Sequence, residues 1–362
     1  MTEVTIPLHA IKGRGTATRL AHRFEKDTRA AYDDGWGTLE EVAGNQAPIP
    51  TEVVFEDARS AICRNDSPDI YFDYSVNPYR GCEHGCIYCY ARPTHSYLNL
   101  SPGLDFETKI IAKRNIAAML RADLGKRSYV PKLINIGSAT DCYQPVEREL
   151  RLTRGLIELM QEVRHPIALV TKSGGVERDL DLLAPMAADR LAAVYVTITT
   201  LDGELARKLE PRAAAPHRRL RTIRALADAG VPVGVSVAPQ IPFVNDDMEQ
   251  VLQAAFEAGA RTAFYTVVRL PWEVAPLFKQ WLELHYPQRA SRIMARIQEM
   301  RGGKDYDSDF ASRMKGSGLW ADLIKQRFEK TCHRLGLNRQ RTELDFSRFR
   351  PPVRPSAQGS LF

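Results

Sequence analysis

The chain has 362 residues, of which 44% are hydrophobic and 26% charged, a balance typical of a globular protein with one large domain or two. No apolar run reaches the length of a membrane span, and the N-terminus lacks the apolar stretch of a secretory signal. We therefore expect a cytoplasmic protein without membrane contact. The net charge is +6, but from Arg289 onward there are 16 Lys and Arg against 8 Asp and Glu, a local net of +8. This basic end predicts contact with DNA or RNA, although a solvated helical surface explains it equally well.

Three parts of the chain differ in pattern. Residues 1–68 show no sustained periodicity, and we expect an extended arm that lies on the main domain, with partial disorder as the alternative. Residues 69–270 alternate between strand-like and helix-like segments. Residues 271–362 are helical and basic, with amphipathic patterns over 281–300 and 319–335, and we interpret them as a C-terminal extension.

Six short β-prone runs, separated by helical segments, occur in the middle part. Their spacing predicts parallel βα units, because parallel strands need a long crossover. The fold class is therefore α/β, and the count of six predicts a partial (βα)6 TIM-like barrel, with a doubly wound open sheet as the alternative. The runs are 70–77, 133–137, 167–171, 193–199, 231–238 and 262–268.

Two helix ends are marked by glycine. Gly230 follows a helical pattern around residues 220–227, and Gly259 follows one over 247–258, both as left-handed C-terminal caps. Asp246, with Glu249 three residues later, predicts a capping box at the start of the second helix. In either topology the loops after the strands meet at one edge of the sheet, so we expect their polar residues to surround one mouth.

The loop after the first strand carries Cys82, Cys86 and Cys89 in the order C-x3-C-x2-C. Three thiolates in a tight loop can converge on one metal centre, and sulfur ligands favour zinc or an iron–sulfur cluster. A zinc site would need a fourth ligand, for which His84 and His95 are candidates. Cys63 and Cys332 show no partner pattern, and we interpret them as structural.

With Tyr88 just before the last cysteine and a βα series after it, this motif resembles that of the radical S-adenosylmethionine (SAM) superfamily. The resemblance implies a 4Fe–4S cluster held by Cys82, Cys86 and Cys89, with one iron open to SAM. It also implies a partial barrel, an external electron donor of flavodoxin or ferredoxin type, and a 5′-deoxyadenosyl radical that abstracts hydrogen from a substrate.

Within the superfamily, residues from about 77 to 242 resemble spore photoproduct lyase, the DNA-repair branch. The match rests on Ser138-Ala139-Thr140-Asp141, Thr171-Lys172, and the series Thr197-Ile198-Thr199-Thr200, Glu210-Pro211 and Ala238-Pro239. Over most of its length the amino-acid sequence is also similar to that of uncharacterised bacterial proteins described as photolyase-like.

This resemblance implies residue roles. Lys172 is a candidate partner for the SAM carboxylate, although a surface lysine at a strand end is the alternative. Thr140, Thr197 and Thr199 match hydroxyl positions that would bind the methionine or ribose part, although β-propensity alone also explains threonines at strand ends. The backbone of Tyr88 would lie near the adenine.

One departure concerns the hydrogen donor. Spore photoproduct lyase returns a hydrogen atom from the cysteine of a Cys-Thr-Ser-Asp run, and here that position is Ser138. Cys142 is our candidate replacement, with Tyr143 beside it, although Cys142 is equally consistent with an inert buried thiol.

The substrate is left unidentified by the sequence, with nucleic acid favoured by the basic end. Two other functions stay open at this point. They are a nucleic-acid-binding protein with structural zinc, and an iron–sulfur redox or sensor protein.

Overall fold

A computed structural model of the protein describes residues 10–25, 49–340 and 342–352. Its main sheet has the strand order β10-β9-β8-β7-β6-β3-β2. Neighbouring strands from β3 to β10 pair in parallel, and they follow one another in chain order. They are β3 (Tyr74–Val76), β6 (Ile134–Ile136), β7 (Ile167–Thr171), β8 (Ala192–Thr197), β9 (Val233–Ser236) and β10 (Thr262–Phe264). All six predicted strands are therefore confirmed.

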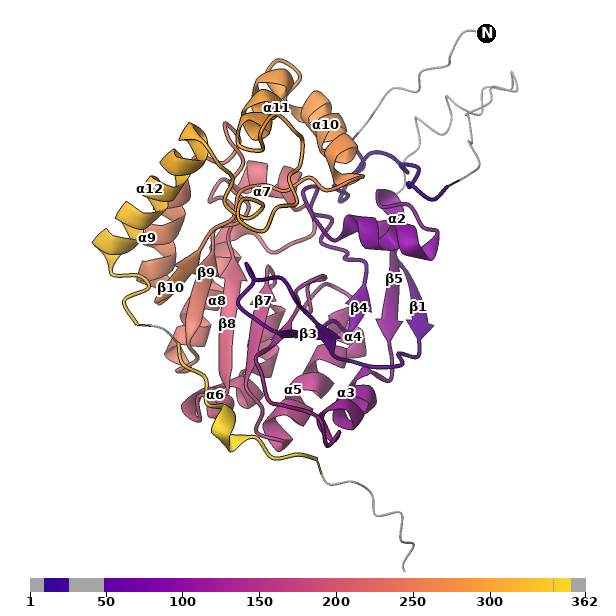
Figure 1. Ribbon diagram of the computed structural model, residues 1–362, viewed down its shortest axis with the longest axis vertical. Coiled ribbons are helices and arrows are strands. Elements are labelled where there is room, and N and C mark those ends of the chain that lie inside the picture. Colours follow the sequence, from indigo (N-terminus) through magenta and orange to yellow (C-terminus); the bar gives the residue numbers. More distant parts are fainter. Residues whose placement is uncertain (1–9, 26–48, 341, 353–362) are drawn as a thin grey trace, which may run out of the picture.

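Each crossover between consecutive parallel strands carries at least one helix, as Figure 1 shows. The sequential strand order confirms the incomplete (βα)6 barrel, because a doubly wound sheet would reverse its order near the centre. The core between sheet and helices is formed by side chains such as Ile136, Leu156, Val194 and Leu252. The helices of the crossovers are α3 (Ile116–Leu124), α4 (Glu147–Leu150), α5 (Leu152–Glu162), α6 (Leu180–Ala188), α7 (Gly203–Leu209), α8 (Pro216–Asp228) and α9 (Met248–Ala258), with the 3-10 helix η2 (Gly174–Asp179) before α6.

The two glycine caps are confirmed, and the capping box is wrong. Gly230 and Gly259 have φ values of +75° and +116°, in the left-handed region that glycine favours. The N-cap of α9 is Asp247 instead of Asp246, and its side chain makes no cap hydrogen bond. Its Oδ2 instead accepts from the backbone N–H of Leu201, 2.7 Å away. Glu249 pairs with Arg327 of the last helix, with its carboxylate 2.6 Å from the guanidinium.

The N-terminal part contributes strands as well as an arm. β2 (Cys63–Arg64) pairs antiparallel with β3 at the edge of the main sheet. β1 (Glu52–Glu56), β5 (Lys109–Lys113) and β4 (Tyr79–Arg80) form a separate three-stranded sheet, near η1 (Arg92–Leu98) and α2 (Leu104–Thr108). Residues 10–25 contain no helix or strand, and 1–9 and 26–48 lie outside the described residues, so the arm stays a prediction. The boundaries 1–68, 69–270 and 271–362 stay predictions.

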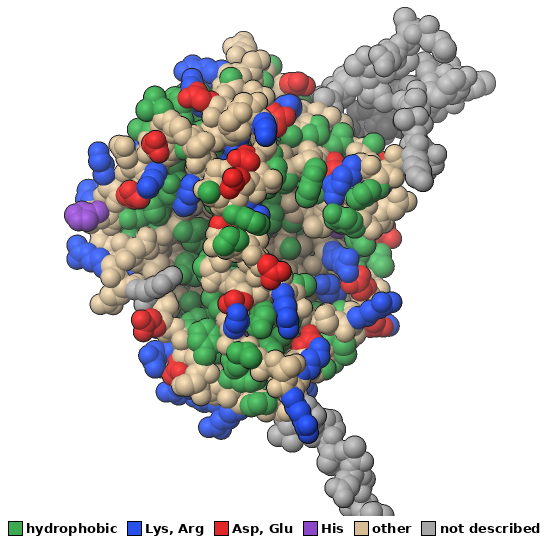
Figure 2. Space-filling model, in the orientation of Figure 1, with side chains coloured by type: hydrophobic (Ala, Val, Ile, Leu, Met, Phe, Trp, Pro, Cys, Tyr) green, Lys and Arg blue, Asp and Glu red, His purple; other side chains and the backbone are tan. Residues whose placement is uncertain are grey.

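The predicted pattern over 281–300 is broken at Tyr286 and falls on the end of one helix and on the next, and the pattern over 319–335 falls on a third. The described C-terminal residues form these three helices. They are α10 (Val274–His285), α11 (Ala290–Glu299) and α12 (Leu319–Leu335), followed by η3 (Phe346–Arg348). In Figure 1, α12 lies alongside α9, and α10 and α11 gather at one end of the molecule. Figure 2 shows lysine and arginine side chains interspersed with acidic ones over the visible face. Among the described residues, no helix combines the length and apolarity that crossing a bilayer requires.

Candidate active site

A cavity of ≈ 620 Å³ opens at the carboxyl ends of the parallel strands. Its wall includes the cysteine loop and residues at or just after the carboxyl ends of the other five parallel strands, among them Ser138 after β6, Thr197 at the end of β8 and Arg269 after β10. The volume is in the range of sites for cofactors and small substrates. The expectation that the loops meet at one mouth is confirmed.

All three cysteines of the motif line this cavity. Cys82 and Cys86 are buried, Cys89 is half-buried, and all three are free thiols. Burial raises the pKa of Cys86 to about 12 and the pKa of Cys82 well above its usual range, and the pKa of Cys82 is raised further by Cys86 and Cys89. These thiols are therefore close enough to oppose one another's ionisation. A cation bound between them would reverse that effect, so the donor set fits a soft metal centre.

The two histidines proposed as zinc ligands are placed differently. His84 lines the cavity, with Nδ1 3.3 Å from Oδ2 of Asp141. His95 is buried elsewhere, with Nε2 3.0 Å from the carbonyl oxygen of Lys109 and its ring against Phe106. Within the described residues, no group of three or more His, Cys, Asp or Glu side chains is spaced for a single metal ion. This holds for the three cysteines as well, so it does not single out His95. It is the position of His95, outside the cavity lining and beside the Lys109 carbonyl, that gives it no support as a ligand.

A buried ion pair holds the cysteine loop in place. Arg92 and Glu107 are both fully buried, with Nη2 of Arg92 2.6 Å from Oε1 of Glu107. Arg92 also donates to the carbonyl oxygens of Cys86 (3.0 Å) and Gly85 (3.1 Å). A charged guanidinium away from water needs all of these partners, so the pair fixes the backbone path between the second cysteine and η1.

The N-terminal arm adds a second support to the same loop. The backbone N–H groups of Gly15 and Thr16 donate to the Glu107 carboxylate at 2.9 and 3.1 Å. A Cβ at position 15 would overlap the carbonyl oxygen of Gly85, so only glycine allows this approach. The arm continues to the mouth, where Arg23 pairs with Glu273 at 2.8 Å. The sequence predicted an arm on the main domain, but no pattern in it indicated the contact with Glu107 beside the cysteine loop. We call residues 14–23 the strap.

Asp141 connects three loops of the site. Its carboxylate accepts from the backbone N–H of Lys172 (2.6 Å) and the hydroxyl of Thr171 (2.7 Å), and it lies beside His84. Burial acts to raise the pKa of Asp141, but His84 and these hydrogen bonds outweigh it and lower the pKa. The ionised carboxylate thus ties the loops after β6 and β7 to the cysteine loop.

Lys172 lines the cavity near the cysteines. Burial acts to lower the pKa of this lysine, but Cys86, Glu210 and Asp141 raise it more, so the amine stays charged. Its Nζ lies 5.9 Å from the ring centroid of Tyr88. The phenol of Tyr88 donates to Glu210, a fully buried carboxylate that also pairs with Arg219. A cation is therefore held beside the thiols.

The predicted SAM-binding threonines divide into two groups. Thr140 and Thr197 are buried and line the cavity. Thr199 is not among the lining residues, and its hydroxyl donates to Glu210 at 2.5 Å. The structure brings Thr140, Thr197, Tyr88 and Lys172 to one wall, whereas Thr199 supports the network behind Tyr88.

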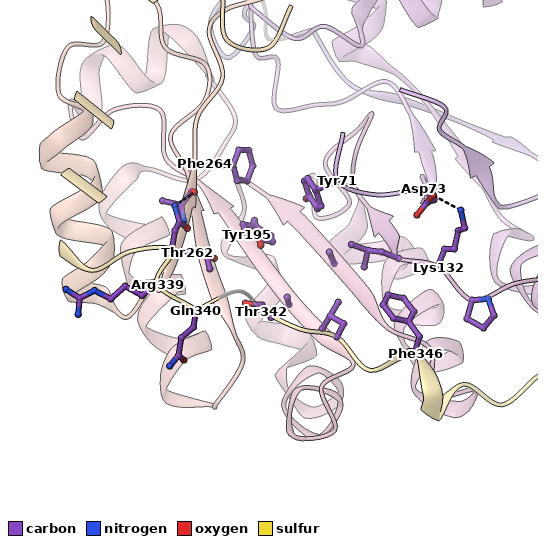
Figure 3. Close-up of a pocket in the computed structure, with 17 residues that line it drawn as sticks. Tyr71, Asp73, Lys132, Tyr195, Thr262, Phe264, Arg339, Gln340, Thr342 and Phe346 are labelled. Atoms are coloured by element: carbon purple, nitrogen blue, oxygen red, sulfur yellow. Dashed lines mark hydrogen bonds and ion pairs between the residues drawn. The ribbon is translucent and has the colours of Figure 1, made fainter. Parts of the chain in front are cut away.

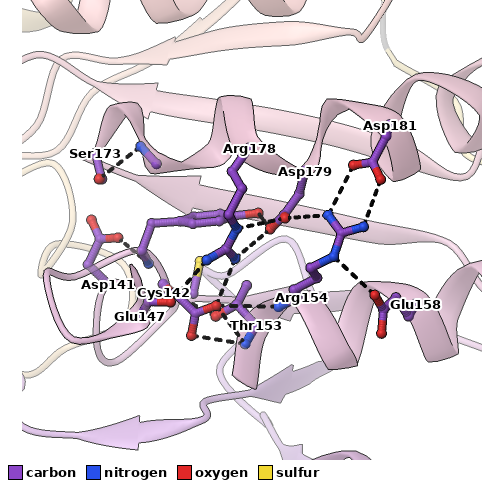
Figure 4. A network of polar contacts seen from close by, with 12 residues as sticks. Asp141, Cys142, Glu147, Thr153, Arg154, Glu158, Ser173, Arg178, Asp179 and Asp181 are labelled. Atoms are coloured by element: carbon purple, nitrogen blue, oxygen red, sulfur yellow. Dashed lines mark hydrogen bonds and ion pairs between the residues drawn. The ribbon is translucent and has the colours of Figure 1, made fainter. Parts of the chain in front are cut away.

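Cys142 and Tyr143 lie outside the cavity wall. The Cys142 thiol is fully buried in the main core, 3.9 Å from the carbonyl oxygen of Ile136. Tyr143 donates to Asp179 at 3.0 Å within a buried network of carboxylates and arginines, which Figure 4 shows together with Cys142. Hydrogen donation by Cys142 stays a prediction, and its position gives it no support. Ser138 does line the cavity, and its carbonyl accepts from Tyr90, the residue after the last cysteine.

Part of the cavity wall comes from far along the chain. Tyr306, Arg313, Met314 and Lys315 of the loop between α11 and α12 line it. No sequence pattern indicated these residues, because the loop has no periodicity and lies beyond the last strand. The basic balance of the chain from Arg289 onward was the one available signal.

A second cavity of ≈ 820 Å³ lies toward the amino ends of the strands, where Figure 3 shows Tyr71, Tyr195 and Phe264 at one end of it. Residues of the C-terminal segment, including Arg339, Gln340, Thr342 and Phe346, line it as well. The rings of Tyr71, Tyr195 and Phe264 contact one another. Tyr71 and Phe264 border both cavities, so this aromatic cluster lies between the two.

Comparisons with known proteins give a family and a fold. A family model described as the radical SAM superfamily matches residues 76–255. An uncharacterised protein of Mycobacterium tuberculosis is 34% identical over 253 residues, spanning 68% of this chain and 74% of that protein. One of Methanocaldococcus jannaschii is 28% identical over 215 residues, spanning 59% and 77%. A spore photoproduct lyase variant solved with AdoMet and dinucleoside spore photoproduct has a TM-score of 0.52 at 17% identity, covering 79% of this chain and 80% of that one. This last likeness concerns the fold alone.

Proposed function

Because the chain belongs to the radical SAM superfamily of enzymes, we propose that Cys82, Cys86 and Cys89 hold a 4Fe–4S cluster with one open iron, and that SAM binds beside it. When bound, the cluster and SAM would supply a 5′-deoxyadenosyl radical that abstracts hydrogen from the substrate. The observation that supports this most is that the three thiols and Lys172 line one cavity at the ends of six parallel strands.

The protein's share of this chemistry is to bind, orient and shield. Lys172 holds an amine at the cavity wall, where it gives a charge-assisted hydrogen bond to the carboxylate of SAM. Thr140 and Thr197 offer hydroxyl groups to the polar atoms of the same ligand. The walls formed by the strand ends limit the access of water and of competing hydrogen donors.

The strap and the Arg92–Glu107 pair act through the cysteine loop. They are positioning elements, because Arg92 bonds to the backbone of the loop and to Glu107, and Glu107 also accepts from the N–H groups of the strap. A loop held at several carbonyl and carboxylate groups keeps its three thiols in one arrangement. We further propose that an external donor of flavodoxin or ferredoxin type delivers the electron.

We also propose that the substrate is a nucleic acid. Its support is the fold shared with spore photoproduct lyase, which has been solved with a dinucleoside photoproduct bound. The surface charge of the C-terminal part supports it less, because Arg313, Arg327 and Arg348 form ion pairs with carboxylates. With Ser138 where that lyase has its donor cysteine, we do not extend the proposal to repair of the spore lesion.

Anaerobic reconstitution with iron and sulfide tests the cluster. We expect about four iron atoms per chain in the wild type, as a 4Fe–4S cluster requires. Cys86→Ala should lose the cluster, because it removes a ligand. Cys63→Ala is the matched control, since Cys63 is exposed and does not line the cavity, and it should keep full iron content. One zinc per chain with no iron, or a full cluster in Cys86→Ala, would contradict the proposal.

A further inference from the structure

The C-terminal part supplies the cavity wall next to the last parallel strand. The backbone N–H of Val267 donates to the carbonyl oxygen of Met314 at 2.9 Å, which joins the segment after β10 to the loop 306–315. Arg301, which is buried, donates to the carbonyl oxygens of Ser312 (2.9 Å) and Val268 (2.8 Å). The loop is therefore fixed to the barrel, and its lining residues are part of the site.

The charges that line the cavity do not balance. Two carboxylates line it, and both are engaged. Asp69 is held by Arg313 through two contacts of 2.6 Å, and Asp141 by His84 and the Lys172 backbone. Within the described residues, Lys172, Arg269 and Lys315 form no ion pair with a carboxylate. If Lys172 takes the carboxylate of SAM, two cations remain for the substrate.

Neutral groups hold both of these cations in place. The guanidinium of Arg269 lies 4.3 Å from the ring centroid of Tyr90, so its face is covered and its N–H edge stays available. Lys315 donates to the carbonyl oxygen of Tyr265 at 2.6 Å, with Nζ 3.4 Å from the centroid of that ring. An ammonium has three donors, so Lys315 keeps others for a ligand.

Three partly exposed aromatic side chains lie at the same mouth. Tyr71, Tyr90 and Trp272 all line the cavity, and they are 50%, 46% and 64% exposed. Exposed rings beside unpaired cations are the chemistry that recognises a nucleobase and its phosphate, through stacking and charge-assisted hydrogen bonds.

We propose that Arg269 and Lys315 form a phosphate-binding site for the substrate, and that Tyr90 and Trp272 stack with the ring next to that phosphate. The substrate is then a nucleotide unit, either free or within a strand. This inference rests on the proposed function, because it places the substrate in the cavity that holds the cysteines.

Binding measurements on the full chain test the site. The probes are a short fluorescein-labelled single-stranded DNA, followed by anisotropy, and AMP, followed by calorimetry. Arg269→Gln and Lys315→Gln should each weaken binding about tenfold, and the slope of log affinity against log salt should fall by about one per lost contact for the strand. Lys304→Gln removes a charge from the segment between α11 and α12, just before residues 306–315 and outside the cavity wall, and should leave binding unchanged.

Each outcome decides the inference. Binding of AMP but not of DNA supports it with a free nucleotide as the source, and binding of DNA supports it with a strand. Equal losses in Lys304→Gln would show surface charge alone and overturn it, as would no binding of either probe at low salt. Iron content and SAM cleavage of the wild type are measured separately, so a protein that cleaves SAM and binds neither probe refutes this site and leaves the proposed function standing.

Discussion

Replacing Glu107 with glutamine tests the buried pair that supports the cysteine loop. The carboxylate accepts from Arg92 (2.6 Å), from the backbone N–H groups of Gly15 (2.9 Å) and Thr16 (3.1 Å), and from the Thr16 hydroxyl (3.1 Å). Glutamine keeps the shape but presents an NH₂ group to at least one of these donors. It also leaves the guanidinium of Arg92 buried without a countercharge.

The structure sets the size of the effect. Removing one partner of a buried ion pair costs about 3–5 kcal/mol, and both side chains here are fully buried. A domain of ordinary stability, about 5–15 kcal/mol, would still fold. For comparison, Glu162 pairs with Arg121 at the surface, where the two side chains are 54% and 44% exposed. Solvent screens that pair, so Glu162→Gln should cost less than about 1 kcal/mol.

Two measurements are needed, namely urea unfolding and the iron content after anaerobic reconstitution. Glu107→Gln should lower the free energy of unfolding by several kcal/mol more than Glu162→Gln. It should also take up less iron, because Arg92 holds the backbone of Gly85 and Cys86. Equal unfolding free energies for the two variants, or full iron in a destabilised Glu107→Gln, would refute the reasoning.

Two further predictions concern the strap and pH. Gly15→Ala should reduce iron uptake, since its Cβ would overlap the Gly85 carbonyl oxygen, whereas Gly203→Ala, whose Cβ meets no described heavy atom within 4 Å, should match the wild type. Equal iron in both variants would show that the strap does not position the loop. Burial lowers the pKa of His165 from 6.5 to about 4, so the unfolded chain binds more protons between these values. The free energy of unfolding should be highest above pH 6.5 and decrease as the pH falls toward 4. By pH 4 the protonation of His165 should have lowered it by roughly 3 kcal/mol. Urea unfolding across that range should show a flatter dependence for His165→Gln, which cannot titrate, and an unchanged dependence would contradict this.

Local patterns were enough to predict the barrel. Strands such as β7 and β8 are short apolar runs with helical segments between them, and glycines such as Gly259 end helices by a backbone rule that the sequence carries. The position of the cysteine loop followed from the same count, because parallel strands place their following loops at one edge.

Contacts between segments that lie far apart in the sequence could not be predicted from local sequence patterns. Gly15 meets Glu107 across 92 positions, and Lys315 reaches Tyr265 across 50, with no periodicity to mark either contact. The predicted cap at Asp246 failed for a related reason, because its neighbour Asp247 bonds to Leu201 and Glu249 pairs with Arg327. Tertiary partners decided the roles of these polar groups.

The most direct test of the central claim is release of 5′-deoxyadenosine from SAM by the anaerobically reconstituted chain, with and without dithionite. We predict release by the wild type that requires the reductant, none from Cys86→Ala, and wild-type release from Cys63→Ala. Wild-type protein that holds a full cluster but releases no 5′-deoxyadenosine under reducing conditions would contradict the account.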